Sequence, residues 1–316
     1  MTNLTLPRLG YGAANVGNLH RAVTDDEATA VLEAAWDSGI RYFDTAPHYG
    51  LGLSERRLGA FLRTKPRGDY VLSTKVGRLL RPNPEGAGGL DNDFAVPADL
   101  RREWDFSAGG IRRSLEESLE RLGLDCVDVL YLHDPERHDL AAGLDSAIPA
   151  LGALRDEGLV SAVGVGSMST PALLACASTG AIDLLMVAGR YTLAEQPALA
   201  EVVPACRRHG VGIVSASVFN SGLLATDDPG SGARYDYGTV PPELLARVRA
   251  IADVCHEWGV PLPTAALQYT LRDDTVRSVV VGGSRVAQVV ENSQRMSAPV
   301  PPGMWTALAE RGLVPE

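Results

Sequence analysis

The chain has few aromatic residues, few cysteines and no long apolar run. Phe, Trp and Tyr make up 6% of the 316 residues, so aliphatic side chains must fill most of any core. The four cysteines are far apart and form neither a CxxC pair nor a zinc-type spacing, which is typical of reduced thiols in the cytoplasm. No apolar segment approaches the roughly 20 residues that span a bilayer, and residues 1–8 do not resemble a signal peptide. We therefore expect a cytoplasmic protein.

The chain also lacks an excess of positive charge. It has 29 Lys and Arg against 39 Asp and Glu, a formal net charge of -10. Nucleic acids and anionic membranes bind concentrated basic surfaces, so neither is expected as the main partner. Hydrophobic residues at 45% and charged residues at 22% are ordinary for a globular protein. We expect a small-molecule substrate, and a monomer or a simple homo-oligomer.

Eight short apolar runs are predicted to be strands. They are nearly continuous rather than alternating, which favours parallel strands that are covered on both faces. The predicted strands are Arg8–Gly12, Ile40–Thr45, Tyr70–Lys75, Val127–His133, Ser161–Gly166, Asp183–Ala188, Gly212–Ser217 and Arg277–Gly282.

Helical patterns separate these strands. In Ala108–Leu122 the apolar residues Ile111, Leu115, Leu119 and Leu122 share one face. The other predicted helices are Asp25–Ser38, Ser54–Arg63, Ala142–Glu157, Thr170–Ser178, Pro197–His209, Pro242–Trp258, Pro263–Leu271 and Arg285–Gln294. Alternation of this length favours a closed (β/α)8 TIM barrel over a doubly wound sheet. No linker composition divides the chain, so residues 1–316 are predicted to form a single domain.

Two connections are too long to be simple turns. They are Val76–Ser107, which is rich in Gly, Pro and Asn, and Val218–Val240, which is rich in Gly, Asp and Pro. Long loops in compact domains are usually functional. Both follow strands, so we expect them at the C-terminal mouth of the barrel, where barrel enzymes build their substrate sites.

Polar residues follow three of the predicted strands. Asp44 ends the second strand and Tyr49 comes five residues later, while Lys75 ends the third strand and His133 the fourth. Hydride transfer at a carbonyl requires a proton to move at the oxygen. A tyrosine hydroxyl, with an ordinary pKa near ~10, needs a nearby cation to lower it. Lys75 is a candidate for that cation, Asp44 for its partner and His133 for orienting the substrate.

The sequence resembles the aldo-keto reductases over nearly its whole length. The matching blocks are LGYG, GIRYFDTAPHYGLGLSERRLGAFL, VLSTK, RRSLEESLERLGLDCVDVLYLHDP, VGVGS and GGSRVAQVVENSQ, in the order that the family has them. The resemblance implies a nicotinamide cofactor and a catalytic tetrad of Asp44, Tyr49, Lys75 and His133. In that tetrad Tyr49 is the proton donor or acceptor.

The resemblance also implies cofactor contacts at strand ends and at the last helix. These are Gly12, Ala13, Asp44, Ser167, Met168, Ser217, Phe219, Asn220, Gly222, Leu223, Gly282, Gly283, Ser284, Arg285, Gln288, Glu291 and Asn292. Many family members that use NADPH carry a lysine and an arginine where this chain has Gly282 and Gln288. Losing two cations favours NAD over NADP, although Arg285 leaves NADP open. The chain also has Ala188 and Ala216 where many relatives have glutamine and tyrosine.

The blocks MVAGRYTLAEQ and VFNSGLLAT resemble the D-threo-aldose (L-fucose) 1-dehydrogenase branch, which includes pyridoxal and L-galactose dehydrogenases. The resemblance implies oxidation of a sugar at its anomeric carbon to a lactone. Candidate substrate contacts are His48, Tyr49, Trp104, His133 and Arg190. Polar loop residues Asp91, Asn92, Asp93 and Asn220 are further candidates for sugar hydroxyls.

Three alternatives remain. In the first alternative, the chain is a pyridoxal dehydrogenase or a general aldehyde or ketone reductase. In the second it is a cofactor-sensing accessory subunit of a membrane channel, as some relatives are, although the complete tetrad disfavours this. The third is a metal-dependent barrel enzyme, which needs clustered ligands at several strand ends. His133 is the only histidine that ends a strand, and Asp44 and Asp134 do not complete a plausible ligand set with it.

Overall fold

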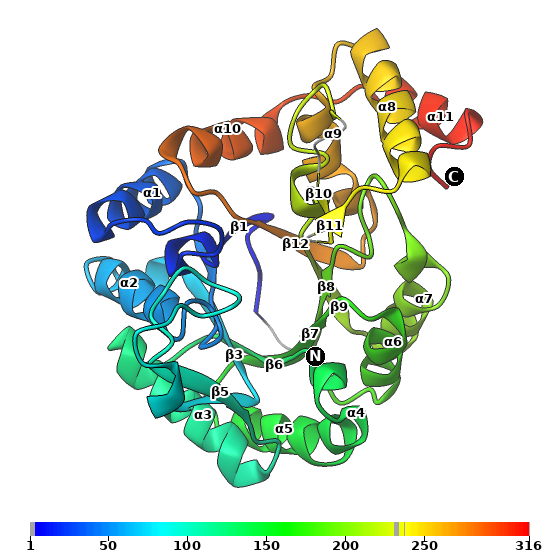
Figure 1. Ribbon diagram of the computed structural model, residues 1–316. Helices are drawn as coiled ribbons and strands as arrows, with labels where there is room; N and C mark the ends of the chain where they lie inside the picture. Colours follow the sequence, from blue (N-terminus) through cyan, green and yellow to red (C-terminus); the bar gives the residue numbers. More distant parts are fainter. Residues whose placement is uncertain (1–3, 231–233, 237, 316) are drawn as a thin grey trace.

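Eight parallel strands close into a barrel, as predicted. The computed structural model describes residues 4–230, 234–236 and 238–315. Around the barrel, each strand bonds to the next in the order β1, β2, β3, β6, β7, β8, β9 and β12, and β12 returns to β1 (Figure 1). The bounds are β1 Leu9–Gly12, β2 Tyr42–Asp44, β3 Val71–Val76, β6 Val129–His133, β7 Ala162–Ser167, β8 Leu184–Ala188, β9 Gly212–Ala216 and β12 Val276–Val281.

Helices form the outer ring around the strands (Figure 1). They are α1 Asp25–Asp37, α2 Leu53–Leu62, α3 Ala108–Leu122, α4 Leu140–Ala142, α5 Ile148–Asp156, α6 Thr170–Ser178, α7 Val202–His209, α8 Pro242–Glu257, α9 Leu262–Gln268, α10 Val286–Ser297 and α11 Pro302–Glu310. Helix α3 begins where the Ser107 hydroxyl accepts from the Gly110 N–H, and it ends at Gly123 in the left-handed conformation. Its predicted apolar face is confirmed, because Ile111, Leu115 and Leu122 are buried. Within the described residues, no helix is long and apolar enough to cross a membrane.

The structure differs from the sequence-based expectation in its irregular segments. The predicted helix Ala142–Glu157 begins with a π-helical turn, Gly143–Ala147, and the C-terminal helix α11 was not predicted. The first long connection contains an antiparallel hairpin, β4 Arg78–Pro82 and β5 Leu100–Trp104. Strand β5 is rich in charge and half-exposed, so it lacks the apolar run that identifies barrel strands. The second long connection contains β10 Arg234–Tyr235 and β11 Gly238–Thr239, and its residues 231–233 and 237 lie outside the described residues.

Side chains of each barrel strand alternate between the barrel interior and the helix layer. The interior cluster includes Tyr42, Tyr131 and Met186. The Tyr42 hydroxyl lies 3.1 Å from Ser73 Oγ and 3.4 Å from the Tyr131 hydroxyl, so the polar tips of these buried rings have partners. This filled layer closes the barrel beneath the mouth and forms the floor on which the site is built.

Close contact between α2 and α3 depends on Gly59. An added Cβ there would lie 2.1 Å from the Leu122 carbonyl oxygen, which belongs to the backbone. Gly59→Ala is therefore expected to lower the free energy of unfolding by roughly 1–3 kcal/mol through overpacking. Urea unfolding would show this as a lower midpoint at an unchanged m value. Gly152→Ala in α5 is the control, because open space surrounds that position and alanine favours the helix by up to about 1 kcal/mol. An equal response of the two variants would contradict the argument.

Candidate active site

Strand parity brings three of the predicted residues together at the mouth. Asp44, Lys75 and His133 come two residues after Tyr42, Ser73 and Tyr131, which face the barrel interior. Residues two apart on a strand share a face, so all three side chains point inward above the filled layer. Because β2, β3 and β6 are neighbours, the three side chains meet on one side of the mouth.

Asp44 and Lys75 form a buried ion pair. Lys75 Nζ donates to Asp44 Oδ2 at 2.5 Å and to the Thr45 carbonyl oxygen at 3.0 Å. Ser73 Oγ donates to the other carboxylate oxygen at 2.7 Å. Burial lowers the pKa of Lys75, but Asp44 and then Tyr49 outweigh it, and the net pKa is raised. Lys75 therefore stays charged although it is 2% exposed.

Tyr49 lies on the turn after β2, beside this pair. The Lys75 ammonium is 4.7 Å from the centroid of its ring, and the His133 ring stands perpendicular to it at 5.8 Å. Burial raises the pKa of Tyr49, and Lys75 is the largest opposing influence. Lys75 thus lowers the pKa of Tyr49, as expected. Burial raises that pKa by more, so the net pKa of Tyr49 is raised. A cation next to a phenol favours the phenolate, so the arrangement can pass a proton.

Both histidines of the site are neutral. Burial, followed by Arg78, lowers the pKa of His133 well below its ordinary value. Burial, Arg78 and Arg102 lower the pKa of His48 to about 2. The two rings meet edge to face at 5.5 Å, and the buried Nδ1 of His133 has no hydrogen-bond partner. A neutral imidazole has one donor and one acceptor, so each ring can hold a polar group without carrying charge.

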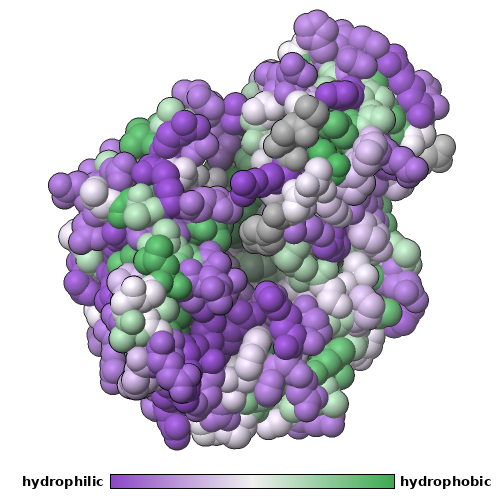
Figure 2. Space-filling model, viewed as in Figure 1, coloured by the Kyte–Doolittle hydropathy of each residue, from purple (hydrophilic) through white to green (hydrophobic). Residues whose placement is uncertain are grey.

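The opposite side of the mouth is lined by small residues. Gly166, Ala188 and Ala216 occupy the inward positions at the ends of β7, β8 and β9. Gly12 ends β1 and Gly282 directly follows β12, and a Cβ added at Gly282 would lie 3.2 Å from the Gly12 carbonyl oxygen. Figure 2 shows this face hollowed near the centre of the barrel, with hydrophilic residues around the rim. Because these inward strand-end positions carry only small residues, they leave room for a flat ring at the mouth.

Two segments next to this space have features that suit a dinucleotide. After β9, Asn220 has a φ of 45°, and its buried Oδ1, an acceptor without a partner, is open to a hydroxyl or amide donor. Helix α10 starts at Arg285 without a side-chain cap, so its first N–H groups are free for an anion. The residues present therefore fit a dinucleotide that runs from the small-residue side of the mouth to the start of α10.

Comparison with known proteins agrees with this geometry. Residues 8–311 match the model of the aldo/keto reductase family. The chain belongs to the aldo/keto reductase family. It is 62% identical over 315 residues to D-threo-aldose 1-dehydrogenase of a Pseudomonas species, which covers 99% of this chain and 96% of the relative. It is 36% identical to pyridoxal 4-dehydrogenase of Microbacterium luteolum, over 99% of this chain and 96% of that enzyme. L-galactose dehydrogenase of Arabidopsis thaliana is 33% identical over 92% of this chain and 84% of that enzyme.

A solved aldo-keto reductase from Bacillus halodurans has the same fold. Its TM-score is 0.77 at 26% identity, and the match covers 99% of this chain and 94% of that structure. This aldo-keto reductase is accordingly an NAD(P)-dependent oxidoreductase. Among the described residues, no group of His, Cys, Asp or Glu could hold a metal ion. The four cysteines are free thiols, as predicted.

Several residues predicted from the family have other partners in this aldo-keto reductase. Ser167 shares its strand face with the outward Val165, and its hydroxyl donates to Glu136 at 2.6 Å. Arg190 donates to the Met168 carbonyl oxygen and to Asp236. Trp104 stacks on His138 at 5.3 Å beneath the Arg78 guanidinium, so it belongs to the base of the hairpin. Both Ser167 and Arg190 lie next to the predicted cofactor segments rather than at the tetrad.

The remaining predicted cofactor residues lie in two groups. Ala13, Ser217, Phe219, Gly222 and Leu223 follow β1 and β9 at the mouth; Ser217 and Gly222 have positive φ. At the start of α10, Gln288 accepts from the Ser284 N–H at 3.0 Å, and Gly283 accepts from Tyr11. Glu291 pairs with Arg295, and Asn292 is buried.

Sequence reasoning missed the charged and aromatic residues that surround the tetrad. Arg78 pairs with Asp134 at 2.5 Å, and this carboxylate lies 3.7 Å from His133 Nε2. Arg102 contacts His48, and Phe94 lies edge to face with the His48 ring at 5.2 Å. Asp134 directly follows the end of β6, and Arg78 comes two residues after the end of β3; this closeness to strand ends is the signal that the sequence offers. Arg102 and Phe94 have no such signal in the sequence, because only the folding of the hairpin brings them to the mouth.

Proposed function

We propose that this enzyme oxidises an aldose at its anomeric carbon to the lactone. The 62% identity to D-threo-aldose 1-dehydrogenase supports the substrate class. The observation that carries the chemistry is the buried Asp44–Lys75 pair beneath Tyr49, with a neutral His133 beside it. These four residues form the proposed catalytic tetrad, and His48 and Tyr49 are proposed to contact the sugar.

Each residue of the tetrad has a distinct part in the proposed reaction. A bound oxidised nicotinamide would supply the hydride acceptor for the anomeric carbon. Tyr49 accepts the proton of the anomeric hydroxyl, and the Lys75 ammonium stabilises the phenolate that this step needs. Asp44 holds Lys75 charged and in place. The neutral His133 imidazole hydrogen-bonds the sugar oxygen and fixes its orientation.

The proposed cofactor is NAD rather than NADP. Arg285 is exposed at the N-cap of α10, and its side chain makes no hydrogen bond or ion pair with the described residues, so one cation is available near that end. Gln288 is neutral and already bonds the Ser284 N–H, while Glu291 adds a negative charge one turn further on. A 2′-phosphate binds strongly where several charged donors converge, and this arrangement offers few.

A substrate and cofactor panel tests the proposal. The purified enzyme is mixed with L-fucose, D-arabinose or L-galactose and with NAD or NADP separately, and reduced nicotinamide is followed by absorbance. We expect rapid reduction of NAD with at least one sugar, and a kcat/KM at least tenfold lower with NADP. Turnover of pyridoxal without turnover of any sugar would replace the aldose with pyridoxal. Reduction of small aldehydes alone would make the enzyme a general carbonyl reductase.

We further propose that the chain is one barrel domain and acts in the cytoplasm on a small molecule. Three of the free cysteines are buried, which suits a reducing compartment. The chain's net charge of -10 does not favour nucleic acid or anionic membrane as a partner. A monomer or a simple homo-oligomer is expected by gel filtration with light scattering.

A further inference from the structure

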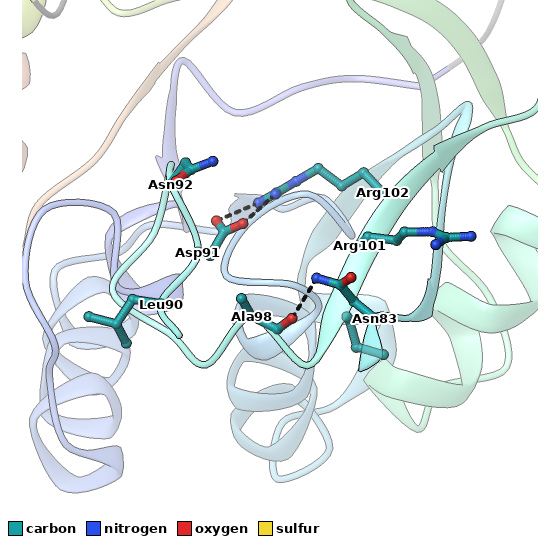
Figure 3. A pocket seen from close by; sticks show the side chains of 8 residues that line it. Asn83, Leu90, Asp91, Asn92, Ala98, Arg101 and Arg102 are labelled. Atoms are coloured by element: carbon teal, nitrogen blue, oxygen red, sulfur yellow. Dashed lines mark hydrogen bonds and ion pairs between the residues drawn. The ribbon is translucent and has the colours of Figure 1, made fainter. Parts of the chain in front are cut away.

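Arg102, on strand β5 of the hairpin, joins the hairpin to His48 at the mouth. Its Nε donates to His48 Nδ1 at 2.5 Å, and its Nη2 donates to the His48 carbonyl oxygen at 3.1 Å. The outer edge of the guanidinium binds both oxygens of Asp91, at 2.6 and 2.9 Å. Figure 3 shows Asp91 and Arg102 pointing toward one another, whereas the neighbouring Arg101 points away. One guanidinium therefore holds a carboxylate on one edge and an imidazole on another.

The rest of the hairpin loop fixes this clamp, which consists of Asp91 and Arg102. Asp91 Oδ2 also accepts from the N–H groups of Asp93 and Phe94, at 3.2 and 3.1 Å. The Phe94 ring packs edge to face on His48 at 5.2 Å. A cavity of about 310 Å³ lies along the other side of the clamp, lined by Asn83, Leu90, Asp91, Asn92, Ala98, Leu100, Arg101 and Arg102 (Figure 3). Away from the cavity, Phe94 and Val96 pack in a buried cluster with Leu51, and Ala95 exchanges hydrogen bonds with Asn18, so the clamp is one of several ties between loop and mouth.

The clamp determines which nitrogen of His48 carries the hydrogen. Because an arginine N–H only donates, Nδ1 of His48 must accept and cannot be protonated. The ring is neutral, since burial and the cations Arg78, Arg102, Arg137 and Lys75 disfavour its charged form. The hydrogen must then be on Nε2, which makes this nitrogen the single donor of the ring. The centroid of the His48 ring lies 6.0 Å from that of Tyr49 and 5.5 Å from that of His133.

We propose that the clamp holds His48 as its Nε2–H tautomer so that it donates to the sugar hydroxyl beside the anomeric carbon. His48 is then a specificity-determining residue, and Arg102 and Asp91 are positioning residues that act through it. This inference rests on the proposed aldose oxidation. It also explains why Asp91, a predicted sugar ligand, is not free to bind sugar: its carboxylate is occupied by Arg102.

The kinetic test compares L-fucose with 2-deoxy-L-fucose in Arg102→Lys, which keeps the charge opposite Asp91 but lacks the planar fork that binds Asp91 on one edge and His48 on another. We expect kcat/KM for L-fucose to fall at least tenfold, mainly through KM, and that for the deoxy sugar to change less than twofold. Arg101→Lys is the matched control, because Arg101 is exposed and pairs with Glu103. In a His48→Phe background, Arg102→Lys should add less than a twofold effect. An equal loss for both sugars, or additive effects of the two substitutions, would overturn the proposal.

A spectroscopic test decides the tautomer without relying on turnover. Imidazole ¹⁵N shifts of the labelled protein should show His48 with hydrogen on Nε2 and a bare Nδ1, and a mixture of tautomers in Arg102→Lys. A hydrogen on Nδ1 in the wild-type protein would overturn the clamp. If no sugar is oxidised but the expected tautomer is seen, the proposed substrate fails while the clamp stands.

Discussion

Replacing Tyr49 with phenylalanine is expected to lower kcat by about 10²–10⁴, the range over which positioned proton transfer accelerates reactions. The hydroxyl is the group that would exchange a proton with the sugar oxygen, and phenylalanine keeps the ring that packs near His133 and Phe94. The small-residue side of the mouth and the start of α10 are unchanged. The dissociation constant of the reduced cofactor, measured by fluorescence titration, should therefore stay within about twofold.

Tyr42→Phe is the matched control for this variant. Tyr42 is a fully buried tyrosine one layer below the site, and its hydroxyl contacts Ser73 and Tyr131. Losing it should cost about 0.5–1.5 kcal/mol of stability and leave kcat nearly unchanged. A near-normal kcat in Tyr49→Phe, measured alongside an unchanged Tyr42→Phe enzyme, would remove Tyr49 from the proposed chemistry.

Replacing Lys75 with methionine is expected to shift the pH profile of sugar oxidation to higher pH. Tyr49 accepts a proton as phenolate, which forms above its pKa. Burial raises that pKa and Lys75 opposes the rise, so removing the ammonium raises the pKa further. The rising limb of kcat/KM against pH should move up by at least about one unit, since each unit corresponds to about 1.4 kcal/mol of lost interaction.

The same substitution leaves Asp44 buried and without its cation. Breaking a buried ion pair by removing one partner costs about 3–5 kcal/mol, so Lys75→Met should also unfold at lower urea. Adding Asp44→Asn removes the unpaired charge, and should recover stability while the shifted pH profile remains. Ser73→Ala removes one hydrogen bond to Asp44 but keeps the ammonium, and its profile should not move. A Lys75→Met enzyme that is active with the wild-type profile would exclude Lys75 as the group that tunes Tyr49.

The barrel could be predicted because its strands have a recognisable sequence pattern. A parallel strand covered on both faces needs apolar side chains in both directions, so each strand appears as a short apolar run in one sequence. The eight runs correspond to the eight barrel strands within a few residues. Asp44, Lys75 and His133 stand out because each is a polar residue at the C-terminal end of such a run, where barrel strands reach the mouth.

Other parts of the site leave no such local signal. Strand β5 pairs with β4 through backbone hydrogen bonds, which any sequence can make, and its charged side chains resemble those of a loop. Arg102 and His48 are 54 positions apart, and their contact exists only because the hairpin folds over the mouth. The outward direction of Ser167 depends on strand parity and on Glu136 in the helix layer.

The sequence by itself determined the barrel, its strand order and the residue types at the strand ends, because apolar periodicity and chain order are local properties. Only the tertiary structure decided the protonation of the site. Burial raises the pKa of Tyr49, burial and then four surrounding cations lower the pKa of His48, and one guanidinium selects the tautomer of that ring. Each of these effects depends on distances between residues far apart in the chain, and such distances are set only when the barrel has closed and the hairpin has folded over it.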